Sequence, residues 1–166
     1  MKRLAILALM PAFLFACGPA EEADEAGEAP QSGIQLDVTP PEALEVPELR
    51  ELASDEDWEA KAHNKNREII QVINIINPIA AYIVKGFEEY GERFSPTLEE
   101  EWADTQVQLT AATTLWDSCK ERMAAADYDK KLFLDLEEVW QLLVKTGVAG
   151  VRTKTMVDSE LSRMTG

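Results

Sequence analysis

The sequence predicts an all-α protein: an antiparallel up-down bundle of three long helices that follows a disordered acidic tether. Two observations carry this prediction. Apolar residues recur at alternating intervals of four and three along three long segments, a spacing that places them on one face of a helix. No segment shows the strict apolar and polar alternation that is typical of a half-buried β-strand.

The first helix is expected to begin near Ser54, which resembles an N-cap residue with the acidic Asp57 three positions later. Its apolar seam suits packing against neighbouring helices at a crossing angle of about 20°. Upstream, a group of apolar residues predicts either a short helix or an extended strap. The seam is Ile69, Ile73, Ile76, Ala80, Ile83, Phe87, Tyr90 and Phe94, and the upstream group is Leu44, Val46, Leu49 and Leu52.

A second helix is expected after Ser95-Pro96-Thr97, where Thr97 and Glu100 resemble a capping box. Asp127-Tyr128-Asp129 is expected to end the second helix and to cap the start of the third. Because the two loops, at 94–97 and 126–129, are short, consecutive helices should be antiparallel neighbours. The second apolar stripe is Leu98, Trp102, Thr105, Leu109, Ala112, Trp116, Cys119, Met123 and Ala126, and the third is Leu132, Leu136, Val139, Leu143 and Thr146.

Gly147 and Gly150 leave the number of helices open. They either end the third helix, which makes 151–164 a fourth, or bend it.

The first residues have the organisation of an export signal. Lys2 and Arg3 precede an apolar run from Leu4 to Phe15. At about 12 residues, this run is long enough for a signal and too short for a membrane span. The sequence Leu14-Phe15-Ala16-Cys17 that closes it resembles the lipobox of bacterial lipoproteins.

That resemblance implies a signal peptide over residues 1–16 and a lipid anchor on Cys17, with acyl chains such as palmitate. It places the protein in the cell envelope. An aspartate after the cysteine commonly retains such proteins in the inner membrane, so Gly18 favours the periplasmic face of the outer membrane.

Residues 17–47 are expected to comprise the lipidated cysteine and a disordered acidic linker, which leaves 48–166 as the helical domain. The linker contains too few large apolar residues to offset its chain entropy by burial. It is either a tether that lets the domain search away from the membrane or an acidic docking tail for a basic partner. No basic residue lies between Arg3 and Arg50, and the acids there are Glu21, Glu22, Asp24, Glu25, Glu28, Asp37, Glu42, Glu45 and Glu48.

Composition excludes several classes of function. The formal net charge is -15, which disfavours binding to nucleic acid. Lipidation of the Cys17 thiol would leave Cys119 as the only free thiol, so no disulfide could form within the chain. We find no catalytic motif, metal-ligand spacing or cofactor motif. His63 is expected to be an exposed surface residue and Cys119 a small core residue.

The stretch from Ile69 to Val84 is apolar nearly all round, and Pro78 should kink it near Asn74. One interpretation is a central helix buried by two neighbours. The other is a surface around Pro78, Tyr82 and Ile83 that binds a partner or an apolar ligand. We expect Ile79 to be core and Tyr82 to lie at the edge of the core, with its hydroxyl in water.

These observations favour a membrane-anchored periplasmic lipoprotein with a helical protein-interaction domain. It would be a non-enzymatic accessory, assembly or inhibitory factor that uses no cofactor and binds another envelope protein. The alternative is a carrier or sensor that holds a small apolar ligand between helices near Pro78. A flat apolar patch would favour the first function, and a closed cavity the second.

Overall fold

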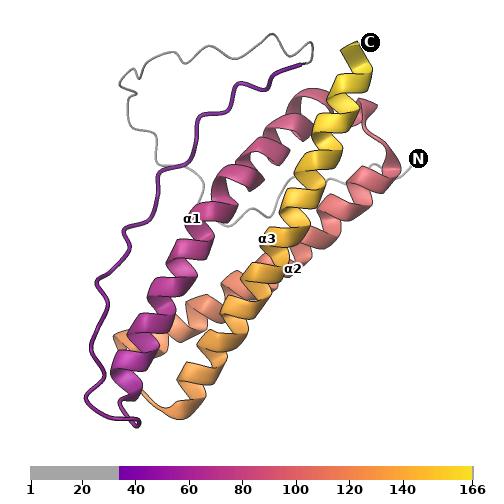
Figure 1. Cartoon of the computed structure of the whole chain (residues 1–166). Helices are drawn as coiled ribbons and strands as arrows, with labels where there is room; N and C mark the ends of the chain where they lie inside the picture. The colour runs from indigo at the N-terminus through magenta and orange to yellow at the C-terminus, as the bar shows by residue number, and fades with distance from the viewer. Residues whose placement is uncertain (1–33, 166) are drawn as a thin grey trace, which may run out of the picture.

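The computed structural model describes residues 34–165. Three long helices, α1 (Trp58–Tyr90), α2 (Pro96–Ala124) and α3 (Lys130–Thr165), form a bundle, and a short 3-10 turn, η2 (Gly91–Arg93), follows α1. The chain runs up α1, down α2 and up α3 (Figure 1). The prediction of an all-α up-down bundle is therefore confirmed for the described part of the chain.

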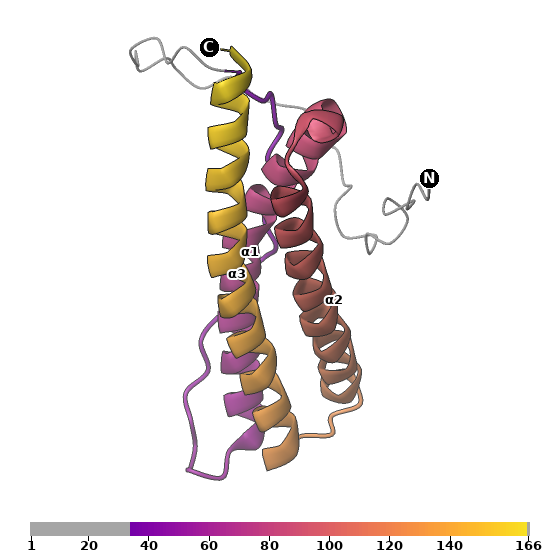
Figure 2. The ribbon, with the colours of Figure 1, turned by 90° about the vertical axis from the view of Figure 1, so that its right-hand side faces the viewer.

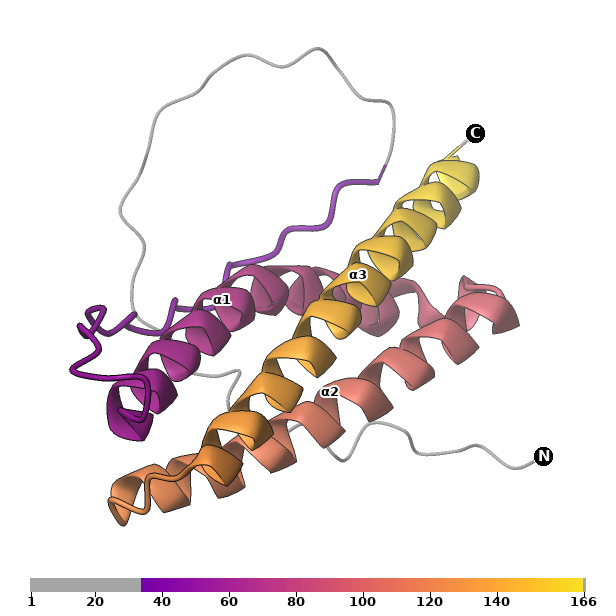
Figure 3. The ribbon, with the colours of Figure 1, turned by 60° about the horizontal axis from the view of Figure 1, so that its bottom comes forward.

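Both α1 and α2 pack along α3. Figure 2 shows α1 and α3 side by side with α2 inclined to them, and Figure 3 shows α3 running over the other two helices. Because α1 and α3 point the same way, residues of α1 meet residues of α3 in a parallel register. Ile76 of α1 lies against Gly147 of α3, and one turn later Ile79 lies against Gly150.

The residues that cap the N-termini of α1 and α2 differ from those that the sequence predicted. Asp57, rather than Ser54, caps α1 and accepts a hydrogen bond from the Ala60 amide at 3.0 Å. Ser95, rather than Thr97, caps α2, because Pro96 occupies its first turn. A proline has no N–H to satisfy there, and it forces the residue before it into extended backbone, the conformation that an N-cap residue needs.

The helix α3 runs without interruption through Gly147 and Gly150, so residues 151–164 do not form a fourth helix, and the alternative that the sequence left open is decided. A Cβ at Gly147 would lie 3.3 Å from Ile76 Cγ1, and one at Gly150 would lie 3.6 Å from Ile79 Cγ2. Gly147 lets α1 approach α3 closely, whereas a Cβ at Gly150 would make an ordinary van der Waals contact. Packing along this line outweighs their poor helix propensity.

The core consists of two clusters stacked along the bundle. The lower one is built around Trp116, whose Nε1 donates to Asn66 Oδ1 of α1 at 2.7 Å. The upper one is built around Trp102 and Phe94. The predicted stripes supply most members: Ile69, Ile73, Ile76, Ala112, Cys119, Leu132, Leu136, Val139 and Leu143 below, and Ala80, Ile83 and Leu98 above. Val157 and Leu161 of α3 also belong to the upper cluster, and no predicted stripe contained them.

A carboxylate of α3 joins the upper end of the bundle to the start of α2. Glu160 is only 8% exposed, and its two oxygens accept hydrogen bonds from the Ser95 amide at 2.8 Å and from the Ser95 hydroxyl at 2.5 Å. Ser95 is itself the N-cap of α2. The contact therefore holds the loop before α2 against α3.

Residues 34–52 form an extended strap along α1 (Figure 1). Asn74 holds it, since its amide accepts from the Leu44 N–H at 2.8 Å and donates to the Leu44 carbonyl at 2.9 Å. Leu36 packs beside Gly86. Residues 34–47 thus differ from the disordered linker that we expected, because these side-chain contacts fix them to α1. The other part of that linker, with Cys17 and Gly18, lies outside the described residues, as does the signal peptide.

Candidate functional site

The three candidate contact residues of α1 have different environments. Pro78 is exposed, Tyr82 is half-buried, and Ile83 is fully buried in the upper core. The prediction of Ile83 as a contact residue is therefore wrong. It lies on the same seam as Ile76 and Ala80, which faces the interior. Ile79, which we expected in the core, is half-buried at the edge of the α1–α3 contact.

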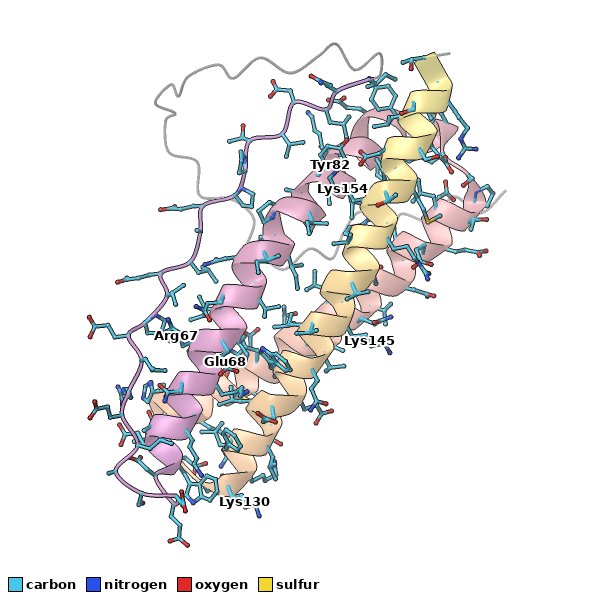
Figure 4. All side chains as sticks on the ribbon, viewed as in Figure 1. Arg67, Glu68, Tyr82, Lys130, Lys145 and Lys154 are labelled. Atoms are coloured by element: carbon cyan, nitrogen blue, oxygen red, sulfur yellow. The ribbon has the colours of Figure 1, made fainter. Side chains whose placement is uncertain are left out.

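Tyr82 belongs to a polar cluster that joins α1 to α3 (Figure 4). Its hydroxyl donates to Asp158 Oδ1 at 2.5 Å, so the prediction of a hydroxyl left in water is wrong. Lys154 lies over the Tyr82 ring at 4.3 Å from the centroid and donates to Asp158 Oδ2 at 2.8 Å. Burial, followed by the hydrogen bond to Asp158, raises the pKa of Tyr82 above its usual value, so the phenol remains a neutral donor.

A small apolar cavity lies where the three helices meet beside Ile79. Its volume is about 10 Å³, close to the space that one water needs, whereas pockets for small ligands typically hold about 300–1,000 Å³. A ligand here would have to push the helices apart. The cavity is lined by Ile76, Ile79, Ala80, Ile83, Trp102, Thr105, Leu109, Thr146, Gly147 and Gly150.

A solvent-exposed apolar patch, which we call the α1–α3 face, spans the line where Gly147 meets Ile76. It comprises Ile75 of α1, which is 66% exposed, and Val144, Val148 and Val151 of α3, which are 37%, 70% and 52% exposed. The valines share one helix face because they are spaced by four and three. Val148 also lines a hollow between α2 and α3, together with Lys145 and Arg152 of α3 and with Glu101, Asp104 and Gln108 of α2.

The prediction of a contact surface from sequence missed these valines. Their own spacing of four and three on the side of the helix opposite the core stripe was the available signal. It was hidden because Gly147 and Gly150 left open whether the regular helix continues there. Once α3 is continuous, the second stripe has no covering element among the described residues.

His63 is half-buried rather than exposed. Its Nε2 lies 3.0 Å from the Tyr128 hydroxyl oxygen, and that hydroxyl donates to the Met123 carbonyl at 3.1 Å. Desolvation, and then the charge of Arg50, lowers the pKa of His63, although Glu59 acts in the opposite direction. The loop before α3 folds over the histidine, which the local sequence does not indicate.

Cys119 lies in the lower core as predicted. Burial raises the pKa of its thiol to about 11, so the reactive thiolate is scarce at neutral pH. Within residues 34–165, no group of three or more histidine, cysteine or carboxylate side chains is arranged to hold a metal ion.

The segment 58–93 is long and apolar enough to cross a membrane by length and composition alone. The core helix of a soluble protein meets the same criterion. Here Ile69, Ile76 and Ile83 are buried against the other helices, whereas Ile75 is 66% exposed, so packing in the bundle explains part of the apolar character of α1.

Comparison of the chain with protein-family models, with curated proteins and with solved structures gave no match.

Proposed function

We propose that this chain is a bacterial lipoprotein, held to the membrane by acyl chains on Cys17, whose bundle binds another protein of the cell envelope. The lipobox-like sequence at 14–17 supports the anchor, and Gly18 favours the periplasmic face of the outer membrane. The proposed role is that of a non-enzymatic accessory, assembly or inhibitory factor.

The observation that carries the binding role is the α1–α3 face. Its aliphatic side chains project from two helices that are locked together by the glycine contacts and by the Tyr82–Asp158 hydrogen bond. Contiguous exposed apolar surface is typical of sites that contact other proteins. A rigid platform also loses little conformational entropy on binding. The alternative role as a carrier of an apolar ligand has less support, because the apolar cavity beside Ile79 has a volume of only about 10 Å³.

The anchor is tested by metabolic labelling with a fatty acid. Native protein and a Cys119→Ser variant should take up the label, and Cys17→Ser should not. Equal labelling of Cys17→Ser would contradict the anchor.

The binding role is tested by co-purification from envelope extract with Val148→Asp and Val107→Asp. Both positions are 70% exposed, and Val107 lies on α2, outside the α1–α3 face. Both variants should melt like the native protein, because neither change buries a charge. Only Val148→Asp should lose the partner. Equal retention by the two variants would refute the proposed surface.

A further inference from the structure

Part of the strap consists of four similar triplets. Residues 41–52 read Pro-Glu-Ala, Leu-Glu-Val, Pro-Glu-Leu and Arg-Glu-Leu, so the second residue of each triplet is glutamate and the third is aliphatic. These residues form neither a helix nor a strand. A period of three residues is that of the polyproline II helix, which has no internal hydrogen bonds. The pattern therefore places the side chains of this segment in three rows.

The first residues of the triplets lie against α1. The N–H and the carbonyl of Leu44 are both bound by a side chain of α1. Three residues later, the Pro47 carbonyl accepts a hydrogen bond from Arg67 Nε at 3.0 Å, and Figure 4 shows Arg67 on the strap side of α1. Three residues later again, the side chain of Asn64 binds the N–H and the carbonyl of Arg50, each at 2.8 Å.

The spacing of these contacts shows that the segment is extended. Leu44 and Arg50 are six residues apart, and their partners Asn74 and Asn64 are ten residues apart on α1. Ten residues of α-helix span about 15 Å. Six residues span about 19 Å as a polyproline II helix but only about 9 Å as an α-helix. Because the contacts are closer to the extended value, the second and third residues of each triplet are free to point away from α1.

Two rows of side chains project into solvent from this segment. The acidic row, which is exposed and forms no ion pair with any residue in 34–165, is Glu42, Glu45, Glu48 and Glu51. The aliphatic row is Ala43, Val46, Leu49 and Leu52, of which the last three are 37%, 70% and 50% exposed. Neither cation that contacts the triplets pairs with the acidic row, because Arg50 pairs with Glu59 at 2.9 Å and Arg67 Nε donates to a backbone carbonyl.

We propose that residues 41–52 dock through these two rows in a groove of a partner protein that has one apolar wall and one basic wall. Apolar side chains of the partner would cover Val46, Leu49 and Leu52, and Arg or Lys side chains about 9 Å apart would meet the glutamates. The segment is already extended and fixed to α1, so it loses little conformational entropy on binding. This inference goes beyond the proposed function, because it assigns a second surface that shares no residue with the α1–α3 face.

The glutamates decide which occupant fits the two rows. The aliphatic row alone would suit a lipid surface or a second copy of the chain equally well. An anionic membrane surface would be repelled by the acidic row. In a symmetric dimer through this segment, the acidic row of each subunit would face that of the other, which disfavours the contact. A basic groove in a partner protein meets neither difficulty.

The test is selection of a displayed library of small β-sheet domains against the full-length chain. Surface positions on one face of the domain are randomised among Arg, Lys, Glu, Gln, Ser, Leu and Trp. Domains that bind a variant with Glu45→Gln, Glu48→Gln and Leu49→Ser are discarded first, which removes those that bind acidic surface elsewhere on the chain. The domains then selected should be enriched in Arg or Lys together with Leu or Trp.

Fluorescence anisotropy of one selected domain measures the contribution of each row. Glu48→Gln and Leu49→Ser should each lower the affinity about five- to tenfold. Matched controls carry the same chemical changes at exposed positions of α3, as Glu138→Gln and Leu134→Ser. Both controls should bind like the native chain, as should Val148→Asp in the α1–α3 face. All five variants should have the native Tm, because each position is exposed.

The outcomes separate this inference from the proposed function. Failure to select any domain, or selection of neutral or acidic domains, would overturn the inference. Equal losses of affinity in the strap variants and in the α3 controls would also overturn it, because binding would then not depend on the two rows. None of these results bears on the α1–α3 face, which is tested by loss of the envelope partner with Val148→Asp.

Discussion

Removal of the Glu160 carboxylate should unlock the upper end of the bundle. Glu160→Ala deletes both hydrogen bonds to Ser95 and leaves the amide and hydroxyl of Ser95 without their acceptor. A hydrogen bond to a charged group contributes about 1.5–3 kcal/mol net. Ser95 is half-buried, so water replaces part of the loss. We expect Glu160→Ala to reduce the free energy of unfolding by about 2–3 kcal/mol.

The assay is chemical and thermal unfolding of the native chain and three variants. For a domain of this size the loss corresponds to a Tm lower by roughly 6–12 °C. Glu160→Gln keeps one acceptor and should lose about 1 kcal/mol. Glu138→Ala removes an exposed carboxylate of the same helix and should change stability by less than about 0.5 kcal/mol.

A double-mutant cycle with Ser95→Ala isolates the contact, because the two side chains share one hydrogen bond. The coupling energy should be about 1 kcal/mol or more. If Glu160→Ala has the same Tm as Glu138→Ala, or if the effects of Glu160→Ala and Ser95→Ala on stability are additive, the Glu160 carboxylate does not hold the loop and the reasoning is wrong.

Three further predictions follow from the packing and the pKa shifts. Trp116→Ala should lower the free energy of unfolding by about 3–5 kcal/mol in chemical denaturation, because the buried indole is lost. Trp116→Phe should lower it less, because the phenyl ring fills part of the space. Equal losses in the two variants would assign the effect to the hydrogen bond with Asn66. Gly150→Ala should raise Tm, since the new Cβ would meet only Ile79 at 3.6 Å and alanine favours the helix. Gly86→Ala should lower Tm, since the new Cβ would lie 3.1 Å from a Val157 methyl group. Equal shifts of Tm in the two variants would contradict this account of the packing. The pKa of His63 is lower in the folded chain than in the unfolded chain, so as the pH falls the unfolded chain is protonated at this residue before the folded chain. The free energy of unfolding should therefore decrease as the pH drops below about 6.5. Thermal melting from pH 7.5 to 5.5 should show this decrease in the native chain and a smaller one in His63→Gln.

The candidate site was only partly predictable. The sequence selected Pro78, which is exposed, and Tyr82, which is half-buried, but it also selected the buried Ile83. In a helix that is apolar nearly all round, periodicity cannot rank one face above another. The α1–α3 face joins Ile75 to Val144, which lie more than 60 positions apart in the chain. No local pattern contains that information.

The sequence alone determined the all-α class, the three apolar seams and the approximate positions of both interhelical loops. These features depend on local spacing, on prolines and on capping residues, whose physics acts within a few positions of the chain. Only the tertiary structure decided that α3 continues through Gly147, that the strap lies on α1, and which apolar residues remain in water. Each of these depends on what lies opposite: Ile76 against Gly147, and Asn74 against the Leu44 backbone. Helix continuity and burial are set by such contacts, because tertiary packing contributes more free energy than the propensity of a single residue.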